Sequence, residues 1–170
     1  MFTCRVVRFR WVVAAAAINY TVDALGEALT DGTLGGDPHM FSGDNFTVEA
    51  KFGAEANENL YHSFDHFNIV SGGSATFTGP SYIQSVITRV TGHLSGTLEP
   101  STIDGLLKSD ILGADFWFIN PAGVMFGSGA SIDVTGSFHA STASEVRFPD
   151  GLVFSAVNPG GPNTLSVEPP

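Results

Sequence analysis

The sequence predicts an all-β fold made of many short strands, and three observations support this prediction. Signals for helices are scarce, because Gly, Thr, Ser, Asn and β-branched residues are spread throughout and no window beyond the first apolar stretch keeps an apolar stripe of helical period. Runs of strand-forming residues recur about every 10 residues, bounded by Gly, Pro, Asn or Ser. The 170 residues include 20 Gly and 9 Pro, about one residue in six, which supply the turns.

The N-terminal segment resembles a secretory signal. Arginines within the first ten residues precede the apolar stretch 11–18 (WVVAAAAI), which is too short to span a bilayer. Residues 22–24 (VDA) would suit a signal peptidase that cleaves after Ala24. Two alternatives stay open for this segment: a first strand or helix of the folded domain, or a misplaced start codon that shortens a longer signal. We interpret residues 1–24 as the signal and residues 25–170 as the exported domain.

Several runs after the signal are predicted to form strands. The clearest covers residues 130–141, where small or apolar residues alternate strictly with Ser, Asp, Thr and His. This pattern is typical of one strand with a buried face and a wet face. The other runs, in chain order, are 60–69, 74–78, 82–91, 102–107, 115–119, 124–126 and 151–156.

Such strands form a sandwich, a barrel or a solenoid, and the turns favour a chain that bends at corners and continues. Asn-Gly, the strongest signal of a two-residue hairpin, is absent, although Asp-Gly occurs at 31–32, 104–105 and 150–151. In residues 120–123 (NPAG) the Asn side chain can hydrogen-bond the backbone two residues on, Pro fixes φ and Gly suits the fourth position of a type I turn. We predict a rigid corner there, between two buried strands.

Charge and cysteine content exclude several functional classes. The chain has 7 basic and 17 acidic residues, a net charge of −10, and three of the basic residues lie within the first ten positions. The remainder therefore carries 4 − 17 = −13, which argues against a nucleic-acid binder and against a peripheral membrane protein. The sole cysteine, Cys4, excludes a disulfide framework and a zinc site built on cysteines.

The stretch 60–69 contains residue types that catalyse reactions or bind metals elsewhere. His62 and His66 have the i, i+4 spacing of metal ligands on a helix, but this stretch is predicted to be a strand, on which both would share one face about 13 Å apart. Ser63, Asp65 and His66 are the residue types of a hydrolase triad, but no Gly-x-Ser-x-Gly elbow occurs. Core and surface roles are the favoured interpretation.

Other candidate sites are weaker. Asp104 and Asp133 would bind calcium or share a proton only if adjacent coils stacked them about 5 Å apart. Neither Lys51 nor Lys108 follows a Gly-rich turn, so no phosphate loop is present. We expect no metal and no cofactor. The aromatic residues are assigned mostly to the core by strand parity, and outward-facing ones would favour a sugar-stacking platform; they are Phe64, Phe67, Phe77, Phe116, Trp117, Phe118, Phe126 and Phe138.

Motifs along the chain carry a family resemblance. They are 59–69 (NLYHSFDHFNI), 75–77 (ATF), 87–92 (ITRVTG), 119–127 (INPAGVMFG) and 132–138 (IDVTGSF). Together they resemble the filamentous haemagglutinin N-terminal domain, which is the two-partner secretion domain of large bacterial exoproteins. Residues 31–35 (DGTLG) look like the opening strand of that family, and the resemblance runs from about Leu34 to the C-terminal end.

The resemblance implies a right-handed parallel β-helix with an N-terminal cap and extra-helical β-hairpins. It also implies that the domain is the secretion-recognition module of an adhesin or haemagglutinin. The partner would be an outer-membrane β-barrel transporter whose periplasmic domains recognise the module, while the coils nucleate β-helix folding during export. The protein would pass through the periplasm and be secreted or displayed on the bacterial surface. Enzymatic activity and nucleic-acid binding are not expected.

The resemblance assigns two motifs to the secretion function. The first matches the family's Asn-Pro-Asn-Gly-Ile except at Ala122 and Val124, and consists of Asn120, Pro121, Ala122, Gly123 and Val124. The second corresponds to an Asn-Pro motif of the family but lacks its Asn; its residues are Gly79, Pro80 and Ile83. Arg89 lies in a stretch shared with the family, and a structural ion pair suits it.

Two other functions are carried as alternatives. The first is a stand-alone surface module that binds carbohydrate or a host receptor, and host or cell-surface glycans would then be partners of the full-length exoprotein. The second is a polysaccharide lyase on a similar solenoid, which needs acidic residues and a basic residue on one face. The chain has few basic residues from which to build such a site. Family members continue through many further coils, so we expect truncation at the C-terminal end and a last coil without a polar cap.

Overall fold

The computed structural model describes residues 27–159 and 165–170, so the expected signal at 1–24 lies outside the described residues. Apart from one 3₁₀ turn, η1 (Ala50–Phe52), the regular elements of these residues are all β-strands. In chain order they are β1 (Glu27–Thr30), β2 (Met40–Ser42), β3 (Asn45–Glu49), β4 (Ala54–Ala56), β5 (Asn59–Asn68), β6 (Ser74–Thr78), β7 (Ser85–Val90), β8 (Ser101–Ile103), β9 (Leu106–Ser109), β10 (Asp115–Ile119), β11 (Val124–Phe126), β12 (Ser131–Asp133), β13 (Phe138–Ser141), β14 (Glu145–Arg147) and β15 (Val153–Ser155). None of the described residues forms a helix long and apolar enough to cross a membrane.

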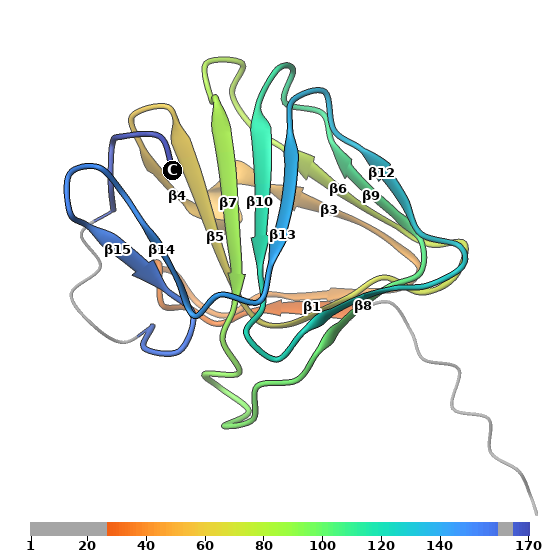
Figure 1. Cartoon of the computed structure of the whole chain (residues 1–170). Helices are drawn as coiled ribbons and strands as arrows, with labels where there is room; N and C mark the ends of the chain where they lie inside the picture. The colour runs from red at the N-terminus through yellow and green to blue at the C-terminus, as the bar shows by residue number, and fades with distance from the viewer. Residues whose placement is uncertain (1–26, 160–164) are drawn as a thin grey trace, which may run out of the picture.

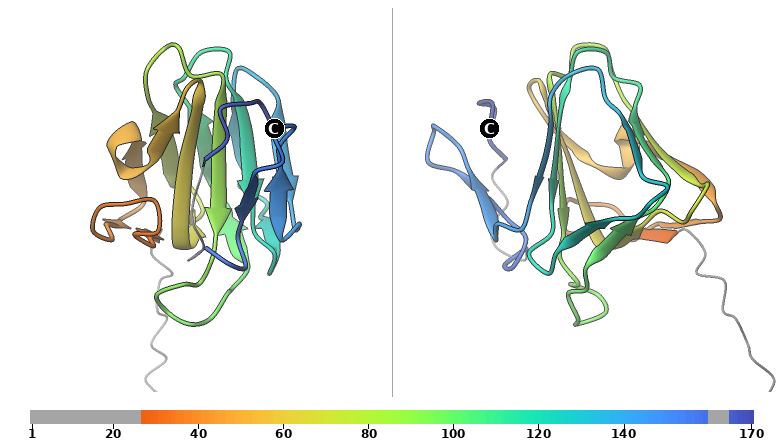
Figure 2. Two further views of the ribbon diagram at one scale, coloured as in Figure 1. Left: turned by 90° about the vertical axis from the view of Figure 1, so that its left-hand side faces the viewer. Right: turned by 45° about the vertical axis from the view of Figure 1, so that its right-hand side comes forward.

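Most of these strands wind around three sides of a triangular prism (Figure 1; Figure 2, right). Side A is the parallel ladder β5-β7-β10-β13, side B is β3-β6-β9-β12, and side C is β8-β11. The chain visits sides B, A and C in turn, so successive coils stack in parallel register. The predicted parallel β-helix is confirmed.

The interior of the prism is a ladder of apolar side chains. On side A, Leu60 pairs with Val86, then Phe116, then Phe138, and all four point inward. Aromatic rings from different coils meet there: Phe77 and Phe116 lie 4.8 Å apart and Phe67 and Phe118 lie 5.3 Å apart, centroid to centroid. Edge-to-face contacts of this kind add to the free energy of burial, so the coils are held by packing as well as by the ladder hydrogen bonds.

The first coil is covered along side A by antiparallel strands. β4 pairs with the start of β5, β1 pairs with its end, and β2 extends the sheet beyond β1. Asn57 allows the tight turn from β4 to β5 because it adopts φ 55°, a conformation that Asn tolerates better than most residues. These strands are the expected N-terminal cap, and they cover the edge that β5 would otherwise expose.

A hairpin outside the prism forms a second layer on side A. β14 and β15 pair antiparallel, and Figure 2 shows them standing apart from the coils. The hairpin buries Phe148 and Phe154 against Tyr61 and Ile87, which point outward from β5 and β7. Since an isolated two-stranded hairpin is marginal in water, its stability depends on this outer face.

Two predicted strands are each two strands in the structure. Residues 130–141 form β12 and β13 with a corner between them, and residues 102–107 contribute to β8 and β9. The apolar–polar alternation continues through these bends because the same face of the chain keeps pointing into the prism. Glycine occupies the bends because a side chain would clash with a neighbouring backbone. A Cβ on Gly105 would lie 2.3 Å from the Gly73 carbonyl oxygen, and a Cβ on Gly136 would lie 2.4 Å from the Ala114 carbonyl oxygen.

Candidate functional site

The predicted corner at residues 120–123 joins β10 on side A to β11 on side C. The Asn120 carbonyl accepts a hydrogen bond from the Gly123 N–H (3.0 Å), and the Asn120 Oδ1 accepts one from the Ala122 N–H (2.9 Å). The side-chain bond was predicted from the Asn-Pro-x-Gly pattern, and the backbone bond closes the predicted turn. The corner is confirmed, but the following strand β11 is half-buried to exposed rather than buried.

Asn120 is fully buried, and its amide ties this corner to the coil before it. The Asn120 Nδ2 donates to the Glu99 carbonyl (2.9 Å) and to the Ser101 hydroxyl (3.0 Å). In the same corner Ala122 is exposed and Pro121 is half-exposed. The motif therefore divides into one residue that builds the corner and neighbours that a partner can touch.

The second motif lies at the other end of side A, in the corner between β6 and β7. Ile83 is buried in the core, whereas Gly79 and Tyr82 are exposed, and the Tyr82 hydroxyl donates to Glu55 (2.7 Å). The six residues of β7 separate this corner from the end of side A that carries Asn120, a distance of about 20 Å. The structure does not bring the two motifs into one patch.

Arg89 is buried on the outer face of side A, beneath the hairpin. Its guanidinium donates to the Ser63 hydroxyl (2.7 Å), the Thr33 hydroxyl (2.9 Å) and the Ser155 carbonyl (2.7 Å). Burial lowers the pKa of Arg89 to about 10, and the nearby Asp31 carboxylate opposes that shift. Arg89 thus remains charged at neutral pH, but it is not accessible to a partner of the folded domain.

Asp31 is the anionic counterpart of Arg89 in this network. Its carboxylate accepts hydrogen bonds from Ser63 (2.6 Å), Thr91 (2.7 Å) and Thr33, both the hydroxyl and the backbone N–H. The expected ion pair is therefore indirect, because the hydroxyls of Ser63 and Thr33 lie between guanidinium and carboxylate. The opening strand expected at residues 31–35 is wrong: these residues form a turn after β1.

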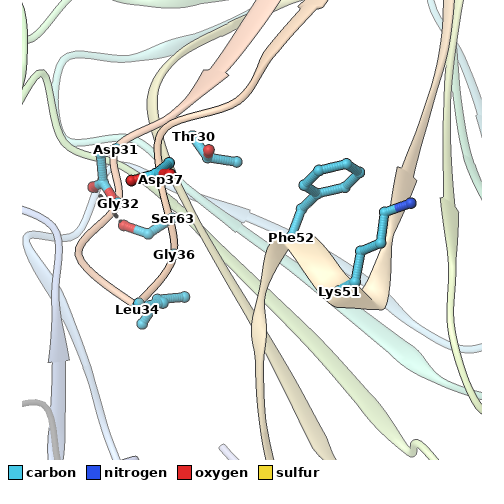
Figure 3. Close-up of a pocket in the computed structure, with 10 residues that line it drawn as sticks. Thr30, Asp31, Gly32, Leu34, Gly36, Asp37, Lys51, Phe52 and Ser63 are labelled. Atoms are coloured by element: carbon cyan, nitrogen blue, oxygen red, sulfur yellow. Dashed lines mark hydrogen bonds between the residues drawn. The ribbon is translucent and has the colours of Figure 1, made fainter.

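The turn after β1 lines a cavity of about 310 Å³ (Figure 3). Its walls are the glycine-rich turn on one side and Lys51 and Phe52 of η1 on the other. The carboxylate of Asp31 and the hydroxyl of Ser63, which lie at the wall, are already bonded to each other. These two polar groups of the cavity thus serve the fold.

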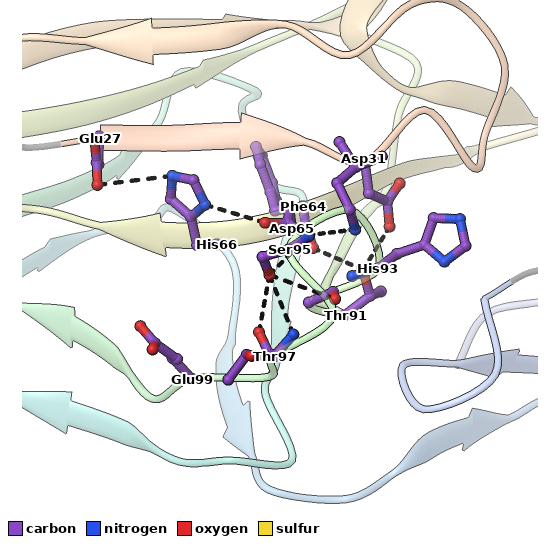
Figure 4. A network of polar contacts seen from close by, with 12 residues as sticks. Glu27, Asp31, Phe64, Asp65, His66, Thr91, His93, Ser95, Thr97 and Glu99 are labelled. Carbon is purple, nitrogen blue, oxygen red and sulfur yellow. Dashed lines mark hydrogen bonds and ion pairs between the residues drawn. The ribbon is translucent and has the colours of Figure 1, made fainter.

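A network of polar contacts joins Asp65 to the loop 91–100 at the corner between sides A and C (Figure 4). We call residues 65, 91–100 and 120–123 the A–C corner. The Asp65 carboxylate accepts hydrogen bonds from the Leu94 N–H (2.6 Å) and the Ser95 N–H (2.9 Å). Burial alone would raise the pKa of Asp65, but these bonds lower it below its usual value. Asp65 and Asn120 fix the loop 91–100 from its two ends.

The bend of β5 separates His62 from His66. β1 pairs Leu29 with His66 but Thr30 with Phe64, so Asp65 is the extra residue of a bulge, and alternate residues change faces there. His62 points into the core, where its ring lies 5.4 Å from that of Phe77. His66 points outward, between Glu27 and Asp65. The expectation that both imidazoles share one face is wrong.

The side chains of the other candidate sites are not brought together either. Ser63 bonds to Asp31 and Arg89, whereas Asp65 is the bulge residue and His66 lies beyond it, so no triad forms. The Asp104 Oδ1 accepts a hydrogen bond from the Gly129 N–H (2.7 Å), whereas the Asp133 Oδ2 lies 4.0 Å from the Lys108 Nζ. The two carboxylates therefore have different partners and are not stacked. Within residues 27–159 and 165–170, no group of three or more His, Cys, Asp and Glu side chains is placed to hold a metal ion.

Comparison with known families identifies the architecture. The model of the TPS secretion domain matches residues 26–170, which is most of the chain. The chain belongs to this family. No curated protein and no solved structure matches it. Membership makes the TPS domain a two-partner secretion module rather than a member of a known enzyme family, and it implies a partner outer-membrane transporter and an exoprotein exported via the periplasm.

Sequence reasoning missed the polar residues that hold the TPS domain together. Asp31, Thr33 and Thr91 were not singled out, because their contacts join positions that are far apart in the chain, such as Asp31 with Thr91. The sequence indicates Asp65 only as a residue type of a hydrolase triad and as part of the motif 59–69. A signal was available for Asp31, since Asp before Gly and Thr favours a turn in which the carboxylate bonds the backbone.

Proposed function

We propose that this TPS domain is recognised in the periplasm by the periplasmic domains of its partner transporter, and that the A–C corner is a surface these domains contact. The observation that carries the proposal is that one residue of the motif is buried while its neighbours are exposed. Asn120 is buried and rigidifies the corner through four hydrogen bonds, two of its side-chain amide, one of its Oδ1 and one of its carbonyl. Pro121 and Ala122 are thereby presented at the surface.

The electrostatics of the corner support the same proposal. The Asp65 carboxylate is bonded to backbone N–H groups of the loop 91–100 and to the Ser95 hydroxyl, so the loop is fixed. A recognition surface made of preordered turns loses little conformational entropy when it binds. The fixed loop and the fixed turn at residues 120–123 together provide such a surface.

A binding measurement tests this proposal. The transporter's periplasmic domains are titrated with the wild-type chain and with Ala122→Lys, which alters the exposed position without removing a side-chain hydrogen bond. Val157→Lys, at an exposed apolar position near the hairpin, is the matched control. We expect binding to the wild type and the control, and at least about tenfold weaker binding to Ala122→Lys. Equal binding of all three chains would contradict the role of the corner.

The second motif is tested separately. Ser81→Lys changes an exposed residue in the corner between β6 and β7. Because that corner lies at the opposite end of side A, we expect Ser81→Lys to bind like the wild type if recognition is confined to the A–C corner. A loss comparable with that of Ala122→Lys would show that the transporter contacts both ends of side A.

We further propose that the stacked coils nucleate folding as the exoprotein emerges from the transporter. Each coil contacts its neighbours in register, as β5, β7 and β10 do, so the order of the chain is the order of the layers. Stability in such a fold is close to a sum of nearest-neighbour terms, and folding can propagate from the first coils. The antiparallel strands β1 and β4 cover the outer edge of β5, so we propose that folding begins at this first coil.

A surface module that binds carbohydrate is the second candidate, and one observation favours it. Trp117 and His139 point outward from β10 and β13 and stack with ring centroids 3.9 Å apart. Both are half-buried, and such a pair can pack against the apolar face of a sugar ring. Binding of glycans to the wild type but not to Trp117→Ala, which keeps the interior face of β10, would support this function, for this chain and for its exoprotein on the bacterial surface.

A further inference from the structure

A polar cavity of about 230 Å³ adjoins the A–C corner. Three segments meet around it: the start of β1, the end of β5, and the loop 91–100 that the Asp65 carboxylate fixes. Its lining residues are Glu27, His66, Asn68, Ser95, Thr97 and Glu99. Pockets for small molecules are mostly apolar and larger than about 300 Å³. A smaller cavity with polar walls is better suited to a single polar side chain.

The imidazole of His66 offers this cavity a hydrogen-bond acceptor. The His66 Nδ1 lies 3.3 Å from the Asp65 Oδ2, and since a carboxylate can only accept, Nδ1 carries a proton. In the neutral imidazole Nε2 is then an acceptor, and this atom is buried without a hydrogen-bond partner among the described residues. The Glu27 Oε1 lies 3.8 Å from Nε2, which is too far for a hydrogen bond.

The cavity is also negatively charged, because two carboxylates line it and no lysine or arginine does. The side chain of Glu27 is 50% exposed and Glu99 is exposed, and Figure 4 shows the two on either side of His66. Every basic residue of the described chain has an acceptor elsewhere; these residues are Lys51, Arg89, Lys108 and Arg147. The charge of the cavity is therefore not neutralised by a basic side chain of the described residues.

The arrangement of the acceptors favours an organic cation over a metal ion. In the part of the chain that the structure describes, the carboxylates and imidazoles are not gathered into a group of three that could ligate a metal. Acceptors spread around a cavity suit a cation that has several N–H donors, as the ammonium of lysine and the planar guanidinium of arginine do. Hydrogen bonds from such donors to carboxylates are stronger than those between neutral groups.

We propose that this cavity receives a basic side chain, arginine or lysine, from the transporter's periplasmic domains, an inference that rests on the function proposed above. The loop 91–100 is part of the A–C corner, so a partner that covers the corner also reaches the cavity. The cation would lie between Glu27 and Glu99 and face the Nε2 of His66. The charge of −13 carried by the residues after position 10 would add long-range attraction for a basic partner surface.

The test measures binding of the full chain to the transporter's periplasmic domains at about 50 mM and about 500 mM NaCl. Glu27→Gln and Glu99→Gln remove a charge and keep the shape of the side chain, and each should weaken binding at least about fivefold at the lower salt concentration. Glu58→Gln is the matched control, since Glu58 is exposed before the opposite end of β5, and it should bind like the wild type. Circular dichroism checks that each variant is folded.

A charge reversal separates electrostatic attraction from a structural effect. Glu99→Lys should bind at least about tenfold more weakly than the wild type at low salt, and this difference should narrow at high salt because salt screens the repulsion. A difference that salt does not change, or equal loss in Glu58→Lys, would overturn the inference. So would wild-type binding of both Gln variants; if Ala122→Lys still weakens binding in that case, the proposed function stands without the cavity. Absence of binding by every chain, the wild type included, would overturn both.

Discussion

The guanidinium of Arg89 lies over the ring of Phe154, with Cζ 4.1 Å from the ring centroid. This contact joins a strand of the β-helix to a hairpin outside it. The same guanidinium bonds to Ser63 on β5 and to Thr33 after β1. Arg89 thus connects the N-terminal turn, the coils and the hairpin through one side chain, and its hydrogen bonds explain why a buried position tolerates an arginine.

Replacing Arg89 should destabilise the domain and release the hairpin. Arg89→Met keeps much of the apolar stem but leaves Asp31 buried without its cation, so we expect a loss of about 3 kcal/mol in the free energy of unfolding. Urea denaturation followed by fluorescence measures this loss. Arg147→Met is the control, because Arg147 is exposed and pairs with Glu145 on the hairpin. Equal stability of Arg89→Met and the wild type would contradict the assignment.

Removing the Asn120 side chain should lower the free energy of unfolding, because this side chain holds the A–C corner together. Asn120→Ala abolishes three side-chain hydrogen bonds and leaves the Ser101 hydroxyl and the Glu99 carbonyl without this donor. We expect a loss of about 2 kcal/mol in unfolding free energy, measured by thermal or urea denaturation. Asn158→Ala, an Asn-to-Ala change at an exposed position, should be close to neutral. If the two variants lose the same stability, Asn120 does not hold the corner.

Stability should fall in mild acid because of His62. Burial lowers the pKa of His62 to about 4, against 6.5 for an unperturbed histidine. Between these values the unfolded chain binds a proton that the folded chain does not, so stability decreases as pH falls from about 6.5 to about 4, by about 3 kcal/mol in total. Urea unfolding at a series of pH values measures the slope.

The matched variants for this pH effect are His62→Leu and His93→Gln. His62→Leu should flatten the dependence in that window, because it removes the group whose pKa differs between the two states. His93 is exposed, so His93→Gln should keep the slope of the wild type. A slope that survives His62→Leu would mean that another group carries the effect.

The hairpin should form after the coils it covers. β14 and β15 have three residues each and gain their burial from Tyr61 and Ile87, which side A must first position. Pulsed hydrogen exchange during refolding reports the order. We expect amides of β7 and β10 to be protected before those of β14 and β15, and simultaneous or reversed protection would contradict propagation from the coils outward.

Local patterns were enough to predict much of the fold. β6, β10 and β11 begin and end where the runs of strand-forming residues do, and the Asn120 corner follows from turn chemistry. The bends inside residues 102–107 and 130–141 were not predicted, because alternation persists where a coil turns. Only the approach of another backbone, as at Gly136, reveals such a bend.

The network of Asp31 and Arg89 lay beyond sequence reasoning for a different reason. Its hydrogen bonds join residues tens of positions apart, and parity places Arg89 on the outer face without indicating that a hairpin covers that face. The bulge at Asp65 was similarly invisible, since it is defined by the register of β1 against β5. Both features depend on which segments become neighbours in space.

Site-specific photo-cross-linking in cells that contain the partner transporter tests the central claim most directly. A photoreactive amino acid at position 122 lies on the exposed A–C corner, and one at position 157 lies at an exposed site near the hairpin. We predict a cross-link to the transporter's periplasmic domains from position 122 and none from position 157. Export of the protein with no cross-link from position 122 would contradict recognition through this corner.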